Sequence, residues 1–185
     1  MTMTRRRTSR VLLLDDRDRL LLLCGRDPRR PGARWWFTVG GGVEDGESHP
    51  AAAVREILEE TALALPVARL GPLVWTRTTV FHVDGHGFDQ HEEYRVARVT
   101  ADERTRMEID PAEARYGHHW WSVPELATTT ETVRPHRMAD LLPALFTPVP
   151  PGRAPLHLGH VDEGAETGPR EPEGGGPGPG PVRVC

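Results

Sequence analysis

The residues of this chain best suited to chemistry are three glutamates at helical spacing: Glu56, Glu59 and Glu60. A helix turns once every ~3.6 residues, so positions three and four apart share a face and the three carboxylates point the same way. Like charges at this spacing destabilise a helix by roughly 0.2–0.5 kcal/mol per pair. An acidic surface helix would explain two adjacent glutamates, but the full cluster indicates a cation held among the carboxylates.

The expected cation is hard and prefers oxygen ligands. Carboxylates without neighbouring Cys or His suit Mg²⁺, with Mn²⁺ as the alternative, rather than zinc. Three glycines precede the predicted helix and allow the backbone to approach a ligand closely: Gly40, Gly41 and Gly42. Arg55 lies next to Glu56 in the sequence and could pair with Glu47, which would hold that acid in place.

These residues resemble the signature of the Nudix hydrolases. The match covers residues 41–63, hereafter the box, and includes Glu47 and Arg55 at the family spacing. One position departs from the pattern, because Ala62 stands where the family has glycine. A left-handed helix end would cost Ala62 about 1 kcal/mol, or the helix runs slightly further. The resemblance is looser over residues 10–146 and does not reach the C-terminal tail.

The resemblance implies Mg²⁺-dependent hydrolysis of a nucleoside diphosphate linked to another moiety, with water attacking phosphorus. It also implies an α/β (α+β) fold, an αβα sandwich with a mixed sheet between helices. By position, it assigns catalysis to Arg55, Glu56 and Glu60. It assigns metal binding to the Gly40 carbonyl, Glu56, Glu59 and Glu60. Glu47 is implied to fix ligand orientation, and Gly41 and Gly42 to contact substrate.

The base that activates water could be an acid of the helix or one from another strand. Outside the box, the best candidates are Glu92 and Glu93, at the start of a predicted strand. Adjacent strand residues face opposite ways, so one of the two should reach the site. We favour Glu92 because Tyr94 and Val96 share its parity. The alternative is that both acids face solvent.

Two more residues are candidates for substrate binding. Arg26 ends a predicted strand and could hold phosphate, with a surface arginine as the alternative. Phe37 belongs to a group of aromatic residues that could stack on a base: Trp35, Phe37, Trp120 and Trp121. Aromatic residues in short strands more often belong to the core, and we expect this for at least two of the four. The histidines match no zinc spacing.

Composition narrows the class of protein. The net charge of -4 and pI near 6.1 argue against nucleic acid as a partner. No segment approaches the ~20 apolar residues that cross a bilayer, and the N-terminus lacks a signal-peptide pattern. The two cysteines do not indicate a disulfide framework, and we expect Cys24 to be a buried free thiol. We expect a cytoplasmic protein that binds a small-molecule nucleotide or nucleoside-diphosphate derivative; a homodimer stays open.

Three regions are expected along the chain: a flexible basic arm at residues 1–9, a Nudix domain at 10–146 and a disordered tail at 147–185. The tail holds nine of the 19 glycines and nine of the 18 prolines. Within the domain, the predicted strands are 10–14, 20–25, 35–37, 67–75, 76–83, 89–99 and 118–123. The predicted helices are 50–62, 124–127 and 135–146, with a turn at 84–87 and a loop at 100–116.

Two other functions compete with hydrolysis. The first is a Nudix-like domain that binds a nucleotide and regulates without catalysis. Such proteins usually lose acids from the box, whereas Glu56, Glu59 and Glu60 are all present. The second is processing of RNA ends, which would favour a basic channel over this acidic balance.

Overall fold

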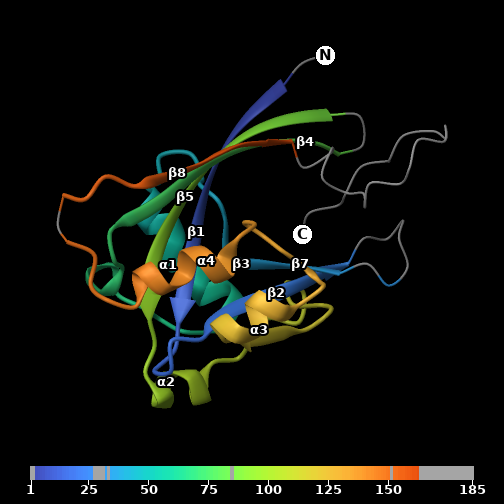
Figure 1. Cartoon of the computed structure of the whole chain (residues 1–185). Helices are drawn as coiled ribbons and strands as arrows, with labels where there is room; N and C mark the ends of the chain where they lie inside the picture. The colour runs from blue at the N-terminus through green and yellow to red at the C-terminus, as the bar shows by residue number, and fades with distance from the viewer. Residues whose placement is uncertain (1–2, 27–31, 33, 84–85, 151, 163–185) are drawn as a thin grey trace.

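The computed structural model describes residues 3–26, 32, 34–83, 86–150 and 152–162 (Figure 1). Its strands form one mixed sheet in the order β6-β2-β3-β1-β5-β4-β8, with β7 paired to β3. Their bounds are β1 (Met3–Leu14), β2 (Leu20–Arg26), β3 (Arg34–Gly42), β4 (Leu73–Val83), β5 (His86–Arg98), β6 (His118–Trp121), β7 (Thr132–Val133) and β8 (Leu156–Asp162). β1 runs antiparallel to β3 and parallel to β5. The long strands β1, β4 and β5 extend together beyond the helices (Figure 1).

Helices cover both faces of this sheet. They are α1 (His49–Thr61), α2 (Ala101–Arg106), α3 (Val123–Thr128), α4 (Met138–Leu141) and the 3-10 turns η1 (Val67–Arg69) and η2 (Leu142–Leu145). Alternate residues of β1 enter two separate cores, as expected of a strand buried on both sides. Val11 and Leu13 pack with Ile57 of α1, while Leu12 packs with Leu142 on the other face. The αβα sandwich with a mixed sheet is therefore confirmed.

The helix α1, which carries the box glutamates, has clear ends. The Ser48 side chain caps its N-terminus by accepting a hydrogen bond from the Ala51 N–H, and Pro50 lies in the first turn. At the other end, Ala62 adopts the left-handed conformation at φ 56° and ψ 12°. A glycine would adopt this conformation without strain, so Ala62 costs about 1–2 kcal/mol. The helix thus ends where the family pattern places its glycine.

The prediction of a flexible arm at residues 1–9 is wrong for residues 3–9, which are the part of this segment that the structure describes. Residues 3–9 belong to β1, and Thr8 and Ser9 are fully buried. Their partners lie in β3 and β5, so the local sequence does not show this pairing. In the same way, β8 lies inside the expected disordered tail and pairs with β4. The rest of that tail, residues 163–185, lies outside the described residues.

Smaller differences concern the loops. The strand predicted at 67–75 begins only at Leu73, after the turn η1. The loop predicted at 100–116 contains α2, whose N-terminus carries a capping box between Thr100 and Glu103. The β4–β5 hairpin is confirmed, although two residues of its turn, 84 and 85, lie outside the described residues. No helix in the described part of the chain is long and apolar enough to cross a membrane.

Candidate active site

The three glycines at the end of β3 bring the backbone against α1 and β1. Gly40 has φ 128°, and a Cβ there would lie 2.2 Å from the Ser9 carbonyl oxygen. A Cβ on Gly41 would lie 2.4 Å from the Glu56 Oε1 atom. The absence of side chains therefore allows the Glu56 carboxylate to lie directly against β3.

Glu60 is the buried acid of the box, with only 3% of its surface exposed. Its Oε2 atom accepts a hydrogen bond of 2.9 Å from the Gly40 N–H. Burial raises the pKa of Glu60 to about 8, although the Gly40 hydrogen bond and the charge of Arg10 act to lower it. This carboxylate needs more positive charge nearby than the protein supplies.

Arg55 connects the other acids. Its Nε and Nη2 atoms donate to the two carboxylate oxygens of Glu47, each at 3.0 Å, and Nη2 also donates to the Gly42 carbonyl at 2.9 Å. Its Nη1 atom donates at 3.0 Å to Glu56 and to Glu59. The hydrogen bonds to Glu47 are the main reason that the pKa of Arg55 is raised. The structure thus brings together the acids and the arginine of the box.

The oxygen atoms that lie together at this site suit a hard divalent cation. Glu56, Glu60 and the Gly40 carbonyl would supply oxygen ligands to such a cation, and burial raises the pKa of Glu56 even though Arg55 acts to lower it. Glu59 differs, because its side chain is 56% exposed and paired with Arg55. Among the described residues, no three acidic, His or Cys side chains already form a complete metal cage. Two carboxylates, one carbonyl and water would match the coordination that Mg²⁺ prefers.

Arg10 lies at the Gly40 carbonyl. Its Nη1 atom donates to that oxygen at 2.7 Å, and its Nε atom is 4.0 Å from Glu92. A carbonyl oxygen has two lone pairs, so this hydrogen bond leaves one for a cation. The sequence interpretation gave Arg10 no role.

Glu92 is buried in an ion pair. Its carboxylate accepts hydrogen bonds from Arg77 at 2.7 Å, Gln90 at 2.7 Å and Tyr94 at 2.6 Å. Burial acts to raise the pKa of Glu92, but Arg77 and the other donors lower it overall. A carboxylate held in this way is a weak base, so the geometry does not favour the predicted role of Glu92 in catalysis.

Glu93 faces the opposite side of β5, as expected from strand alternation. Its carboxylate pairs with Arg95 at 2.8 Å and lies 3.7 Å from the Nδ1 atom of His49, at the start of α1. Of the two candidate strand acids, Glu93 is therefore the one on the side of the box helix.

The predicted substrate-binding residues outside the box divide into two groups. Phe37 lines a small cavity of about 30 Å³ together with Arg10 and Glu92, next to the glycines. Arg26 pairs in register with Arg34, at the opposite end of β3 from the glycines, and its guanidinium lies 5.0 Å from the Tyr116 ring. The structure does not bring Arg26 to the box.

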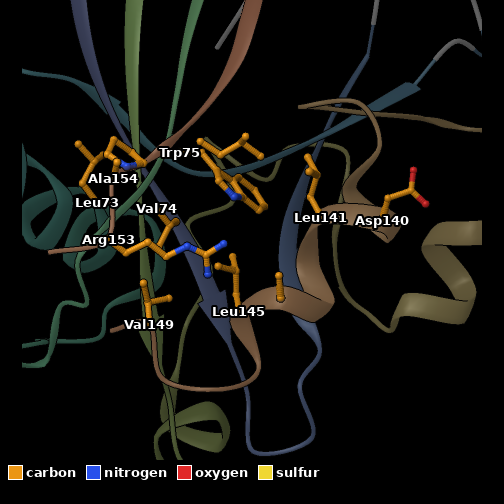
Figure 2. A pocket seen from close by; sticks show the side chains of 12 residues that line it. Leu73, Val74, Trp75, Asp140, Leu141, Leu145, Val149, Arg153 and Ala154 are labelled. Atoms are coloured by element: carbon orange, nitrogen blue, oxygen red, sulfur yellow. The ribbon is translucent and has the colours of Figure 1, made fainter. Parts of the chain in front are cut away.

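The aromatic residues belong mainly to the core, as expected. Trp35 and Trp121 are 7% and 8% exposed, and the Trp121 ring meets Trp36 edge-on at 5.0 Å. A larger cavity of about 280 Å³ lies between β4 and the α4–η2 segment, lined by residues such as Trp75, Leu141 and Arg153 (Figure 2). None of its lining residues belongs to the box.

Comparisons with known proteins agree with this geometry. A family model for the NUDIX domain matches residues 4–145. The chain is 34% identical over 76 residues to dihydroneopterin triphosphate diphosphatase of Escherichia coli K12, covering 41% of this chain and 48% of that protein. It is 29% identical over 149 residues to prenyl-diphosphate phosphatase of Methanosarcina mazei, covering 77% and 73%.

A similar fold occurs in the NUDIX domain of Shewanella oneidensis NrtR, solved with ADP-ribose. That structure has a TM-score of 0.56 and 15% identity, and the likeness covers 79% of this chain and 91% of that one. The chain spans about half the length of the Escherichia coli relative. The family model, in contrast, matches most of the chain and includes every residue of the glycine and glutamate site. This chain therefore belongs to the Nudix family.

Proposed function

We propose that this protein is a Mg²⁺-dependent Nudix hydrolase, with Mn²⁺ as an alternative cation, that cleaves a diphosphate bond in a nucleotide or related small molecule. The observation that carries the proposal is the position of Glu60. This buried carboxylate is fixed by the Gly40 N–H next to Glu56, and its raised pKa reflects a site that favours an added positive charge.

Each residue of the site has a part in this reaction. Glu56, Glu60 and the Gly40 carbonyl hold the cation, with Glu59 as an outer carboxylate. Arg55 orients Glu56, and Glu47 fixes Arg55 through its two-point hydrogen bond. When bound, the cation neutralises charge on the phosphate oxygens and favours attack by water.

The reaction breaks a phosphorus–oxygen bond. Water adds to phosphorus, its proton passes to a base, and the second phosphate leaves with the electrons of the broken bond. We place the base among the box glutamates, because Glu92 already accepts three hydrogen bonds. Without side chains, Gly41 and Gly42 would let a phosphate chain approach the backbone next to the carboxylates.

The substrate class follows from the shared chemistry of the relatives. The names of two relatives specify a triphosphate and a diphosphate, and a third protein was solved with ADP-ribose. All three ligands contain a diphosphate, which supports a diphosphate-containing small molecule for this chain. We keep the cytoplasm as the proposed location, and a homodimer remains a prediction that sedimentation would test.

The test is a substrate panel with Mg²⁺ or Mn²⁺ and matched glutamine variants. The panel contains nucleoside triphosphates, dihydroneopterin triphosphate, prenyl diphosphates and ADP-ribose. Glu56→Gln and Glu60→Gln should each lower turnover by about 100-fold or more. They should also weaken Mn²⁺ binding, measured by electron paramagnetic resonance. Glu59→Gln is the control, because it removes the same charge from an exposed position and should have a smaller effect.

Unchanged turnover and Mn²⁺ affinity in both Glu56→Gln and Glu60→Gln would refute the proposal. Tight binding of a panel member with no turnover in the parent protein would favour the regulatory alternative instead.

A further inference from the structure

Arg6 lies over the glycine segment on the face of β1 shared with Arg10. Positions 6, 8 and 10 alternate with residues that face α1, because side chains of a strand alternate between faces. Thr8 pairs in register with Gly42, and Arg10 with Gly40. A Cβ on Gly42 would lie 3.4 Å from the Nη2 atom of Arg6. The Arg6 guanidinium is therefore next to the backbone that leads into the box.

This guanidinium makes no hydrogen bond or ion pair with any residue in the part of the chain that the structure describes. Its side chain is partly exposed. Partial burial of the charged group, together with the charge of Arg10, lowers the pKa of Arg6, while Glu56 and Glu92 act to raise it. Arg6 thus lies within the electrostatic field of Glu56 and Glu92 without a hydrogen bond or ion pair to either carboxylate.

The other arginines near the glycines are already engaged. Arg10 donates to the Gly40 carbonyl, and Arg55 donates to Glu47 and Glu56. Arg7 points to the other face, where it donates to the Glu47 carbonyl. Arg6 therefore has its donors available next to the expected path of the phosphate chain, where Arg10 reinforces the positive charge.

The positive charges of Arg6 and Arg10 favour a terminal phosphate over a phosphate that is substituted on both sides. A terminal phosphate carries up to two negative charges and has three free oxygens. A phosphate that is substituted on both sides carries one negative charge and has two free oxygens. A guanidinium donates two parallel hydrogen bonds to phosphate oxygens, so a dianionic terminal group gains more from it.

We propose that Arg6 binds the terminal phosphate of the substrate, with Arg10 as the supporting charge, and that it selects substrates ending in an unesterified phosphate. Nucleoside triphosphates and simple organic diphosphates belong to this class. Nucleoside diphosphates esterified to a second group, such as ADP-ribose, do not. The inference rests on the proposed function, because it concerns the same site.

The experiment compares ATP with its γ-methyl ester, which differ only in the terminal phosphate. The parent protein should show a kcat/KM about 10-fold or more higher for ATP. Arg6→Gln should lower kcat/KM for ATP by a similar factor and leave the ester nearly unchanged, so that the preference disappears. Arg5→Gln is the matched control, because it removes the same charge from the neighbouring position on the other face of β1. It should preserve the preference.

The same comparison is made by calorimetric binding of both ligands to the full-length protein, which requires no turnover. The proposal is overturned if Arg6→Gln keeps the preference, if Arg5→Gln abolishes it equally, or if the parent protein treats both ligands alike. These results would leave the proposed hydrolase intact. Absence of hydrolysis across the whole panel would instead refute the proposed function, and the binding comparison would still decide the role of Arg6. Because the Arg6 side chain is partly exposed, Arg6→Gln should fold, and a melting temperature equal to that of the parent protein is the check on this.

Discussion

Replacing Arg55 with lysine tests whether the fork of this side chain organises the site. Arg55 makes five hydrogen bonds to Glu47, the Gly42 carbonyl, Glu56 and Glu59. Lysine keeps the positive charge but has a single nitrogen, so it cannot donate to both oxygens of Glu47 while also reaching Glu56. The substitution therefore removes the two-point hydrogen bonding of the guanidinium but keeps its positive charge.

The magnitude follows from which contacts are lost and how far water screens them. Hydrogen bonds to charged groups contribute about 1.5–3 kcal/mol each when protected from solvent. Arg55 is 25% exposed, and its partner Glu59 is 56% exposed, so the Glu59 contact contributes little. Losing one arm of the Glu47 fork and the Glu56 contact should lower the free energy of unfolding by about 2 kcal/mol after screening. For a domain of this size, the melting temperature should fall by about 4–8 °C.

Two measurements separate stability from function. Differential scanning calorimetry gives the melting temperature, and Mn²⁺ titration should show about 10-fold weaker binding, because Glu56 loses its orienting partner. Arg137→Lys is the control: it makes the same replacement in an exposed pair with Asp140, 75% and 66% exposed, and should leave both values unchanged. If Arg55→Lys matches the parent protein in melting temperature and Mn²⁺ affinity, Arg55 does not organise the site.

Three other variants make independent predictions. Gly41→Ala places a methyl group 2.4 Å from the Glu56 carboxylate and should lower kcat by about 10-fold or more, whereas Gly46→Ala has open space and should change stability but not kcat. Asp15 is buried; burial acts to raise its pKa, but hydrogen bonds from the following turn outweigh this and lower it below the ordinary 3.8. The ionised Asp15 carboxylate therefore stabilises the fold above pH 3.8, and this contribution is lost as the pH falls towards the lower pKa of the folded state. The difference in unfolding free energy between the parent protein and Asp15→Asn should shrink below about pH 4. A difference that stays constant with pH contradicts this. Glu92→Gln breaks a buried ion pair and should cost about 3 kcal/mol of stability with a modest change in kcat, whereas a 100-fold loss of kcat in a folded variant would restore Glu92 as the base.

The parts of the site that could be predicted from the sequence are those fixed by local spacing. The three glutamates, the pairing of Arg55 with Glu47 and the cap at Ser48 all lie within one loop and one helix. Their geometry follows from the period of the helix and from short-range hydrogen bonds, so the spacing of residues in the sequence is enough to predict it.

The parts that could not be predicted depend on strand pairing across long distances in the sequence. Residues 3–9 of the expected arm belong to β1, because β5 pairs along all of them and β3 pairs with Thr8 and Ser9, and neither pairing leaves a local signal in the sequence. The position of Arg6 beside Gly42 depends on this strand pairing, so the local sequence does not indicate it. The parity of Glu92 and Glu93 was predictable, but parity alone could not say which face of the sheet carries the box helix.

The glycines show why both faces of the sheet matter to the chemistry. Gly41 faces α1, where the missing side chain admits the Glu56 carboxylate, while Gly42 faces Arg6. A phosphate chain lying along this backbone would meet the carboxylates of the proposed cation site on one side and the Arg6 guanidinium on the other. Such opposed charges fix the direction of an asymmetric chain, because only the end with the extra negative charge gains from Arg6. The direction of binding then decides which phosphorus lies next to the box acids and which bond water attacks. Substrates without a terminal phosphate lose this constraint, so loss of Arg6 should also broaden the site of cleavage in a triphosphate, which ¹⁸O-water labelling of the products would detect.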